Sequence, residues 1–445
     1  MVDKDELLSR AQKPAADAMR LHPFYQGKIE TVLKAPVRDY NDFAVWYTPG
    51  VAEPCRDIYA DKDRSYIHTN KGNLVAVISD GTRVLGLGDI GPEAALPVME
   101  GKALLFKYLG GVDAVPICLD TKDPEEIIRT VKCLQPSFGG INLEDIASPK
   151  CFYILDRLRE ECHIPVWHDD QQGTACVTLA GLLNALKIVG KDLTRARITL
   201  IGSGAANIAA VRLFKAAGAS PGNIIVCDSK GILHKKRTDI SPEHQDKLMI
   251  MKTTNSEGRR GGPPEAIKGA DAVIALSKPG PGTLKKEWIR DMAADAIVFT
   301  CANPVPEIWP WEAHEAGAAI VSTGRSDFPN QVNNSLGFPA IFRGVLDVRA
   351  RAISDTMCIA AARELALCAE EQGLDSERIL PSMDDLEVFP RVAAATAMQA
   401  IEENLARLVL TREEVMELAA SKIKRAQAQV KILMEKGLIP LPPPE

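Results

Sequence analysis

Two pairs of adjacent acidic residues, Glu144-Asp145 and Asp169-Asp170, each end an apolar run in the first half of the chain. Carboxylates at the ends of neighbouring strands converge on one point, where they repel one another unless a cation neutralises them. Oxygen ligands of this kind favour Mg²⁺ or Mn²⁺, which keeps coordination positions open for water or substrate. Any single acid at a strand end more often caps a helix or lies in solvent. Two pairs in equivalent positions favour a divalent-metal site instead.

A glycine-containing turn follows the second acidic pair and indicates a nucleotide site. The turn Gly202–Asn207 lies between the apolar run 198–201 and a helical pattern, and Asp228 ends the next apolar run. The last position departs from Gly-x-Gly-x-x-Gly, but the strand–turn–helix setting is that of a dinucleotide-binding motif. Its glycines let the backbone approach a pyrophosphate at a helix N-terminus, and Asp228 is placed to accept a ribose hydroxyl. The predicted cofactor residues are Gly202, Ser203, Gly204, Ala205, Ala206, Asn207 and Asp228. A tight turn without a ligand is the alternative.

The elements that must position these residues alternate between apolar runs and helical patterns, which is an α/β signal. In the first half, the predicted strands lie near 74–79, 113–119, 140–143 and 164–167, with helices over 4–19, 97–108 and 124–134. A helical pattern over 174–189 leads into the second half. There, strands near 198–201, 224–227, 272–276, 296–300 and 318–322 predict a doubly wound parallel sheet.

We therefore expect an α/β protein with an N-terminal α/β domain for substrate and metal (1–172) and a Rossmann-like nucleotide domain (173–400). A helical segment (401–445) follows, in which a capping box at Thr411 and Glu414 begins a helix that runs to Lys436.

Composition narrows the class of protein. The 445 residues are 46% hydrophobic and 25% charged, an ordinary globular mixture. A net charge of −6 argues against a nucleic-acid partner, and no apolar window is long enough for a membrane span. The ten cysteines occur singly, which is typical of reduced thiols in the cytoplasm.

Several motifs in a fixed order resemble those of malic enzyme, in its short prokaryotic form, over roughly residues 20–400. In the first half these are Tyr47-Thr-Pro-Gly-Val-Ala, Arg83-Val-Leu-Gly-Leu-Gly-Asp-Ile-Gly, Glu100-Gly-Lys102-Ala, Asn142-Leu-Glu144-Asp145 and His168-Asp-Asp170-Gln-Gln-Gly. In the second half they are Gly202-Ser-Gly204, Cys301-Ala-Asn303-Pro and Asn330-Gln-Val-Asn333-Asn334. The resemblance implies oxidative decarboxylation of L-malate to pyruvate and CO₂ with reduction of NAD⁺ or NADP⁺.

The resemblance also implies roles for individual residues. It makes Tyr47 and Lys102 the catalytic pair, and Glu144, Asp145 and Asp170 the ligands of Mg²⁺ or Mn²⁺, with Asp169 supporting the site. Arg83 matches a residue that grips a substrate carboxylate, and Asn303 and Asn334 match asparagines that contact nicotinamide and substrate. Lys102 would accept the hydroxyl proton of malate if a low-polarity cleft or a cation lowers its pKa. A homodimer or homotetramer is implied as well. His168, beside the acids, is interpreted as a hydrogen-bonding residue rather than a ligand.

Alternatives remain open at this point. An amino-acid dehydrogenase would combine a lysine with a C-terminal Rossmann domain, but it has no use for the acidic pairs. A malolactic-type lyase with bound NAD would share every motif, and a non-catalytic nucleotide-binding sensor would keep only the fold. For the coenzyme, Asp228 repels a 2′-phosphate and favours NAD. Four basic residues close by could bind that phosphate: Lys230, Lys235, Lys236 and Arg237.

Overall fold

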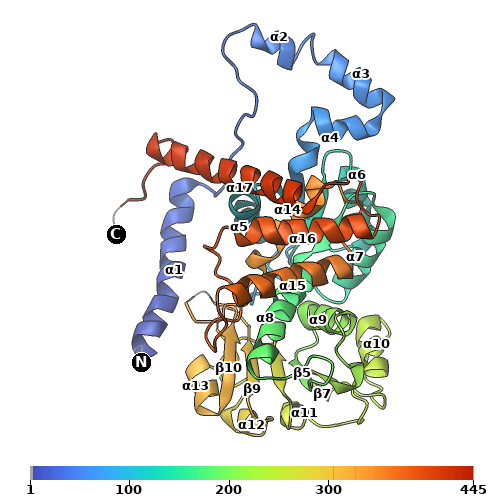
Figure 1. Cartoon of the computed structure of the whole chain (residues 1–445), viewed down its shortest axis with the longest axis vertical. Helices are drawn as coiled ribbons and strands as arrows, with labels where there is room; N and C mark the ends of the chain where they lie inside the picture. Colours follow the sequence, from blue (N-terminus) through green and yellow to red (C-terminus); the bar gives the residue numbers. More distant parts are fainter. Residues whose placement is uncertain (1–3, 304, 326, 444–445) are drawn as a thin grey trace.

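The computed structural model describes residues 4–303, 305–325 and 327–443, and its core is built on one parallel and one mostly parallel sheet (Figure 1). The first sheet has the strand order β2-β1-β3-β4, with every pair parallel. Its strands are β1 (Leu74–Ser79), β2 (Asp113–Cys118), β3 (Gly140–Leu143) and β4 (Val166–His168). The expected strand at 164–167 was placed too early, because the chain joins the β3 ladder only after Pro165, which has no N–H to donate.

The register of the first sheet brings the acidic pairs together. Leu143, the last residue of β3, is the direct partner of His168, the last residue of β4. Both strands run in the same direction, so Glu144 and Asp169 leave the sheet side by side at its carboxyl edge. The convergence expected from the sequence is therefore a consequence of strand pairing.

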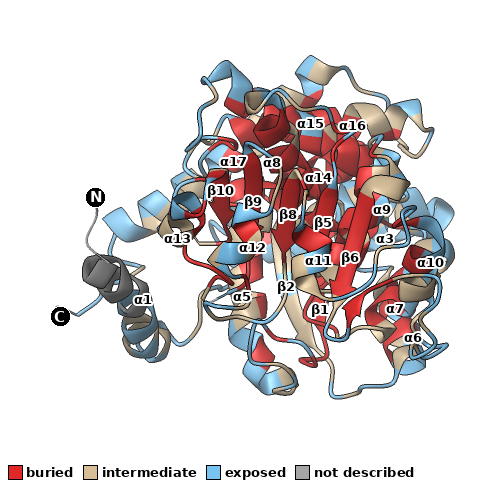
Figure 2. Ribbon diagram, turned by 90° about the horizontal axis from the view of Figure 1, so that it is seen from below, coloured by how far each residue is buried: buried red, intermediate tan, exposed pale blue. Residues whose placement is uncertain are grey.

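The second sheet has the order β10-β9-β8-β5-β6-β7, and only β7 is antiparallel to its neighbour. Its strands are β5 (Ile198–Ile201), β6 (Ile224–Asp228), β7 (Gly231–Ile232), β8 (Ala272–Ala275), β9 (Ala296–Thr300) and β10 (Ala318–Thr323). Chain order runs outward from β5 in both directions, so the strand order reverses there, as in a doubly wound fold. This confirms the predicted α/β fold class. Figure 2 shows β10, β9, β8, β5 and β6 as a mostly buried row.

Helices cover the sheets and link them. Nine of them are α5 (Pro92–Gly110), α6 (Pro124–Leu134), α7 (Lys150–Glu161), α8 (Thr174–Ile188), α9 (Ala205–Ala216), α10 (Gln245–Thr253), α11 (Pro263–Ile267), α12 (Lys286–Arg290) and α13 (Pro310–Glu315). Helix α5 begins earlier than the expected start at 97. Its N1 proline is Pro92, which follows Gly91 at φ 83°, and Pro97 lies inside the helix.

Four further helices complete the C-terminal part: α14 (Phe338–Asp347), α15 (Asp355–Glu371), α16 (Val388–Glu402) and α17 (Arg412–Glu435). α15 packs on α8, whereas α14 and α17 pack on α5 of the first half. The capping box that begins α17 is confirmed, since Glu414 N–H donates to Thr411 Oγ1 at 3.2 Å. The helix ends at Glu435, one residue before the expected end.

The N-terminal segment includes an arm that extends from the body. α1 (Lys4–Tyr25) is longer than the expected 4–19 and is followed by α2 (Asp42–Trp46), α3 (Ala52–Ala60), η1 (Lys62–Arg64), α4 (Ser65–His68) and η2 (Asn70–Asn73). In Figure 1, α2 and α3 project away from both sheets. We call residues 30–60 the N-terminal arm. Its exposed apolar side chains include Val32, Leu33, Val37, Tyr40, Val45, Trp46, Tyr47 and Tyr59. Among the described residues, no helix combines the length and the apolar character that a bilayer span requires.

Candidate active site

Three carboxylates meet at the carboxyl edge of the first sheet. Ligand oxygens of Glu144, Asp145 and Asp170 all lie within 4.8 Å of one another. Asp145 adopts a left-handed backbone conformation (φ 55°), and its N–H donates to Asp170 Oδ2 at 2.8 Å. The three residues predicted to bind a metal are thus brought together.

Burial makes this cluster electrostatically costly without a cation. Glu144 and Asp145 are each only 3% exposed. Burial, together with the repulsion from Asp170, raises the pKa of Asp145 to about 8. Burial also raises the pKa of Glu144 well above its ordinary value, although Lys102 opposes this. Asp145 Oδ2 is buried with no hydrogen-bond partner among the described residues. An all-oxygen donor set with an unpartnered buried oxygen fits a hard divalent cation.

Lys102 extends from α5 into the same cluster. Its Nζ lies 2.6 Å from Asp169 Oδ2 and 3.0 Å from Glu144 Oε1, and 4.5 Å from the centre of the Phe338 ring. Burial acts to lower the Lys102 pKa, but the attraction of Asp169 and Glu144 outweighs it and raises the pKa above its ordinary value. The lowered pKa expected of a proton acceptor therefore requires that these carboxylates be neutralised.

Asp169 anchors Lys102 rather than joining the three-carboxylate cluster. Its Oδ2 accepts hydrogen bonds from Lys102 and, at 2.6 Å, from Asn334 Nδ2, while Oδ1 accepts from Trp167 Nε1 at 3.0 Å. A Cβ at Gly173 would lie 1.9 Å from Asp169 Oδ1, so only glycine fits there. Asp169 is thus held from several sides. Asn334 begins η5 (Asn334–Leu336), so this contact links the second half of the chain to the site.

His168 lies behind the cluster, completely buried. Its Nδ1 is 3.7 Å from Asp170 Oδ2, and neither ring nitrogen has a hydrogen-bond partner among the described residues. The interpretation of His168 as a hydrogen-bonding residue is therefore not met in this structure. Burial lowers its pKa, which favours the neutral ring.

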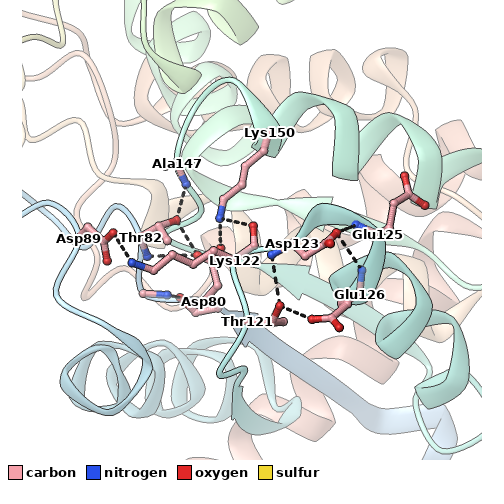
Figure 3. Close-up of polar contacts among 12 residues, drawn as sticks. Asp80, Thr82, Asp89, Thr121, Lys122, Asp123, Glu125, Glu126, Ala147 and Lys150 are labelled. Carbon is pink, nitrogen blue, oxygen red and sulfur yellow. Dashed lines mark hydrogen bonds and ion pairs between the residues drawn. The ribbon is translucent and has the colours of Figure 1, made fainter. Parts of the chain in front are cut away.

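A polar network supports the loops on which the cluster depends (Figure 3). Asp80 Oδ1 accepts from the N–H and the hydroxyl of Thr82, at 3.1 and 2.6 Å. The Thr82 hydroxyl oxygen in turn accepts from Ala147 N–H at 2.9 Å, and Lys150 contacts the other Asp80 oxygen. The loop after β1 is thereby tied to the loop that follows the acidic pair on β3.

Arg83 lies on the first of these loops and faces the nucleotide pocket. Its backbone N–H donates to Asp145 O at 3.0 Å, and its Nη1 donates to Leu85 O at 2.9 Å. The side chain lines a pocket of about 1250 Å³. The lining also includes Gly202, Ser203, Gly204, Asp228, Ser277 and Thr283. The predicted carboxylate-binding arginine thus borders the predicted coenzyme site.

The glycine turn is shaped for close backbone approach. Gly202 has φ 101°, and a Cβ there would lie 2.6 Å from Leu276 O. Asn207 is buried, and its Nδ2 donates to Ile201 O and Gly202 O at 2.9 and 3.0 Å. Of the predicted cofactor residues on this turn, the pocket is lined by Gly202, Ser203 and Gly204, but not by Ala205, Ala206 or Asn207. Asn207 braces the turn from behind.

Asp228 is held by a basic partner at the end of β6. Its two oxygens accept from Arg237 Nη1 and Nη2 at 2.7 and 3.1 Å. The same guanidinium binds Asp239, with which Lys230 also pairs at 3.2 Å. Arg237 is therefore engaged with two carboxylates instead of being free for a phosphate.

Two predicted residues lie apart from the cluster. Tyr47 is 72% exposed at the end of α2 on the N-terminal arm, so one chain does not bring it to Lys102. Asn303 follows β9 and is exposed, with its side-chain amide against Gly324. Sequence reasoning missed Phe338 and Trp167, because nothing in their local spacing signals that they contact Lys102 and Asp169.

Comparisons with known proteins agree with this arrangement. Residues 26–159 match the malic enzyme N-terminal domain, and residues 171–401 match the malic enzyme NAD binding domain. The chain is 50% identical to the bifunctional malic/malolactic enzyme of Bacillus subtilis over 401 residues, which are 90% of this chain and 96% of that protein. It is 52% identical to the NAD-dependent malic enzyme of Geobacillus stearothermophilus, over 86% of this chain and 78% of that protein. It is 46% identical to the NADP-dependent malic enzyme of Halomonas elongata, over 86% of this chain and 92% of that protein.

A solved structure gives the same result. The crystal structure of Entamoeba histolytica malic enzyme superposes with a TM-score of 0.96 at 50% identity, covering 100% of this chain and 93% of that chain. The fold and the site together define a nucleotide-dependent oxidoreductase with an acidic site on a separate parallel sheet. Within that class, the chain belongs to the malic enzyme family.

Proposed function

We propose that the cluster around Lys102 is the active site for the family's reaction. That reaction is the oxidative decarboxylation of L-malate to pyruvate and CO₂ with reduction of NAD⁺ or NADP⁺, so the chain is a malate dehydrogenase (decarboxylating). The observation that supports this location is the contact of Lys102 with both Glu144 and Asp169 beside the three-carboxylate cluster.

Glu144, Asp145 and Asp170 would hold Mg²⁺ or Mn²⁺. When bound, such an ion would supply Lewis-acid chemistry that lowers the pKa of the malate hydroxyl and stabilises negative charge on its oxygen. Neutralising these carboxylates also removes part of the attraction that raises the pKa of Lys102. Lys102 is then able to accept the hydroxyl proton, as the sequence led us to expect.

The coenzyme would lie along the turn Gly202–Gly204, with its adenosine ribose toward Asp228, and it supplies the hydride acceptor. We infer a preference for NAD. The support is the fixed Asp228 carboxylate: a 2′-phosphate would be repelled by Asp228, while Arg237 is already paired with Asp228 and Asp239. Lys230 is paired as well, which weakens the case for a phosphate site.

Other residues would position malate. Arg83 presents a planar guanidinium to a carboxylate from the edge of the pocket. Asn334 holds Asp169 and hence the direction of the Lys102 amine, and Asn303 would contact the nicotinamide end and the substrate. The division into a substrate and metal domain (1–172), a nucleotide domain (173–400) and a helical segment (401–445) assigns these roles to separate parts of the chain.

Tyr47 would protonate C3 of enolpyruvate, and Lys102 would restore its proton. Because Tyr47 is exposed on the N-terminal arm, we propose that a second copy of the chain supplies it, in a homodimer or a tetramer of dimers. The apolar side chains of the arm support this, since a contiguous exposed apolar surface marks an interaction site. In a twofold dimer the two arms would exchange between the two sites.

Mixing two inactive variants tests the shared site. Equal amounts of Tyr47→Phe and Lys102→Ala subunits, unfolded and refolded together, should regain about a quarter of wild-type activity. Random pairing makes about half of the dimers mixed, and one of the two sites in each mixed dimer keeps both residues. Each variant refolded alone is the control. Absence of any recovery, with mixed dimers shown by mass spectrometry, would contradict the shared site.

A malolactic-type reaction is the second candidate, favoured by the similarity to a bifunctional malic/malolactic enzyme. Product analysis distinguishes the two reactions: malate oxidation yields pyruvate and one reduced coenzyme, whereas the malolactic reaction yields lactate without net reduction. Of these we expect pyruvate.

A cytoplasmic location is supported by the ten cysteines, none of which forms a disulfide.

A further inference from the structure

A buried carboxylate outside the acidic cluster lies beneath the nucleotide pocket. The Glu307 side chain is fully buried, and within residues 4–303, 305–325 and 327–443 it makes no ion pair. Buried acids are normally paired with a cation, because burial destabilises the charged form. Glu307 is instead surrounded by neutral donors.

Those donors come from the ends of two neighbouring strands, β8 and β9. Oε1 accepts from the N–H and the hydroxyl of Ser277, at 2.9 and 3.2 Å. Oε2 accepts from Ala302 N–H at 3.1 Å and from the Thr300 hydroxyl at 3.0 Å. Ser277 lies just beyond β8, whereas Thr300 and Ala302 lie at the end of β9. One carboxylate therefore holds the carboxyl edges of both strands together.

The backbone of Glu307 completes the connection. Its carbonyl oxygen accepts from the N–H groups of Gly282 and Leu284, each at 3.1 Å. The loop 277–284 is thus fixed at its start by the Glu307 side chain and at its end by the Glu307 backbone.

This loop forms a wall of the nucleotide pocket. Ser277 and Thr283 line the pocket, as does Gly202 at the end of the neighbouring strand β5. Leu276 approaches Gly202 so closely that a Cβ added at Gly202 would lie 2.6 Å from Leu276 O. Small shifts of the loop 277–284 therefore change the width of the pocket directly. Glu307 is also close to a predicted site residue, because Asn303 directly follows its hydrogen-bond donor Ala302 in the chain. In doubly wound sheets the coenzyme binds at this carboxyl edge.

We propose that Glu307 is a positioning residue for the coenzyme. Its carboxylate sets the loop 277–284 and the backbone that carries Asn303, and so determines how tightly the nicotinamide half of the pocket binds the coenzyme. The proposal rests on the coenzyme site proposed above. Burial raises the pKa of Glu307, while the two backbone N–H donors lower it, which agrees with a carboxylate held by neutral donors.

The test is a fluorescence titration of the whole protein with NADH and with NADPH, alongside steady-state kinetics. Glu307→Gln keeps the shape but turns one acceptor into a donor that faces N–H groups. The Kd of the reduced coenzyme and the KM of the oxidised one should rise about tenfold or more, with little change in the KM for malate. Thr300→Val removes one donor without touching the pocket lining, and should raise the coenzyme Kd by a smaller factor.

Glu312→Gln is the matched control. Glu312 also accepts from a backbone N–H, that of Trp309 at the start of α13, but it does not contact the loop. The coenzyme Kd of the Glu312→Gln protein should equal that of wild type. A folded Glu307→Gln protein with wild-type coenzyme Kd would overturn the proposal, as would equal losses of coenzyme and malate affinity. If Glu307→Gln does not fold, an unchanged coenzyme Kd in Thr300→Val overturns it. If wild type oxidises malate and Glu307→Gln leaves the coenzyme Kd unchanged, this inference alone is refuted. If wild type binds neither coenzyme, the proposed coenzyme site is refuted.

Discussion

Replacing Asp145 by asparagine should have opposite effects on stability with and without a divalent metal. The folded protein raises the pKa of Asp145 from its ordinary value of 3.8 to about 8, by burial and by the charge of Asp170. A carboxyl whose pKa is higher in the folded state binds more protons there than in the unfolded chain. The Asp145 carboxyl therefore leaves the free energy of unfolding unchanged at low pH. It lowers that free energy progressively as the pH rises from about 4 to about 8.

The size of this effect follows from the shift. At about pH 7 a shift of this extent corresponds to at most about 4 kcal/mol, at 1.36 kcal/mol for each pKa unit. Asp170 shares the repulsion with Asp145, so we expect Asp145→Asn to stabilise the metal-free protein by about 1–4 kcal/mol. The asparagine amide also supplies a donor where Asp145 Oδ2 has no partner.

Metal should reverse the order of stability. A ligand that binds only the folded state stabilises it by about 4.1 kcal/mol at a thousand times its Kd. Wild type should gain this with Mn²⁺, whereas Asp145→Asn should gain little. Urea unfolding at pH 7, in EDTA and in Mn²⁺, measures both. The reasoning fails if Asp145→Asn is less stable than wild type in EDTA, or if Mn²⁺ stabilises both proteins equally.

Three further results are expected. Tyr47→Phe should impair malate oxidation while sparing oxaloacetate reduction, and Lys102→Ala should impair both by about 10²–10⁴-fold in NADH absorbance assays; equal losses for Tyr47→Phe in both directions would contradict its role. Wild type should show higher kcat/KM with NAD⁺ than with NADP⁺, and Asp228→Ser should narrow that ratio; a wild-type preference for NADP⁺ would shift the role to the basic stretch 230–237. Gly173→Ala should displace Asp169 and lower turnover, whereas Gly101→Ala, with open space around its Cβ, should not; equal activity in both would refute the close contact.

Strand pairing explains why so much of the fold could be predicted. The runs at 74–79 and 296–300 are continuous and apolar because helices cover both faces of parallel sheets, and they were placed correctly. The acids after β3 and β4 could be predicted to converge because parallel strands end at one edge. Helices α15 and α16 are largely buried, so the amphipathic pattern that reveals a surface helix is weak in them.

The site was predictable only where chemistry follows from residue type. Carboxylates at strand ends indicated the three-carboxylate cluster, and glycines indicated the nucleotide turn. The raised pKa of Lys102 was not predictable, because it depends on Asp169, which is distant in sequence. The exposure of Tyr47 could not be predicted either, because the local sequence around a catalytic residue does not show whether that residue lies on an arm or in a cleft. Asn207 illustrates the same limit: its place in the motif suggested a ligand contact, whereas its side chain braces the turn.

The most direct test of the active-site assignment is NADH formation from L-malate by Lys102→Ala, compared with wild type. Among the described residues, Lys102 is the one charged group that contacts both Glu144 and Asp169 beside the cluster. The assay uses saturating Mn²⁺, with folding verified by circular dichroism and coenzyme binding by NADH fluorescence. We predict wild-type turnover that EDTA abolishes, and a folded, NADH-binding Lys102→Ala protein whose turnover falls by about 10²-fold or more. Near-normal turnover in that protein would contradict the assignment.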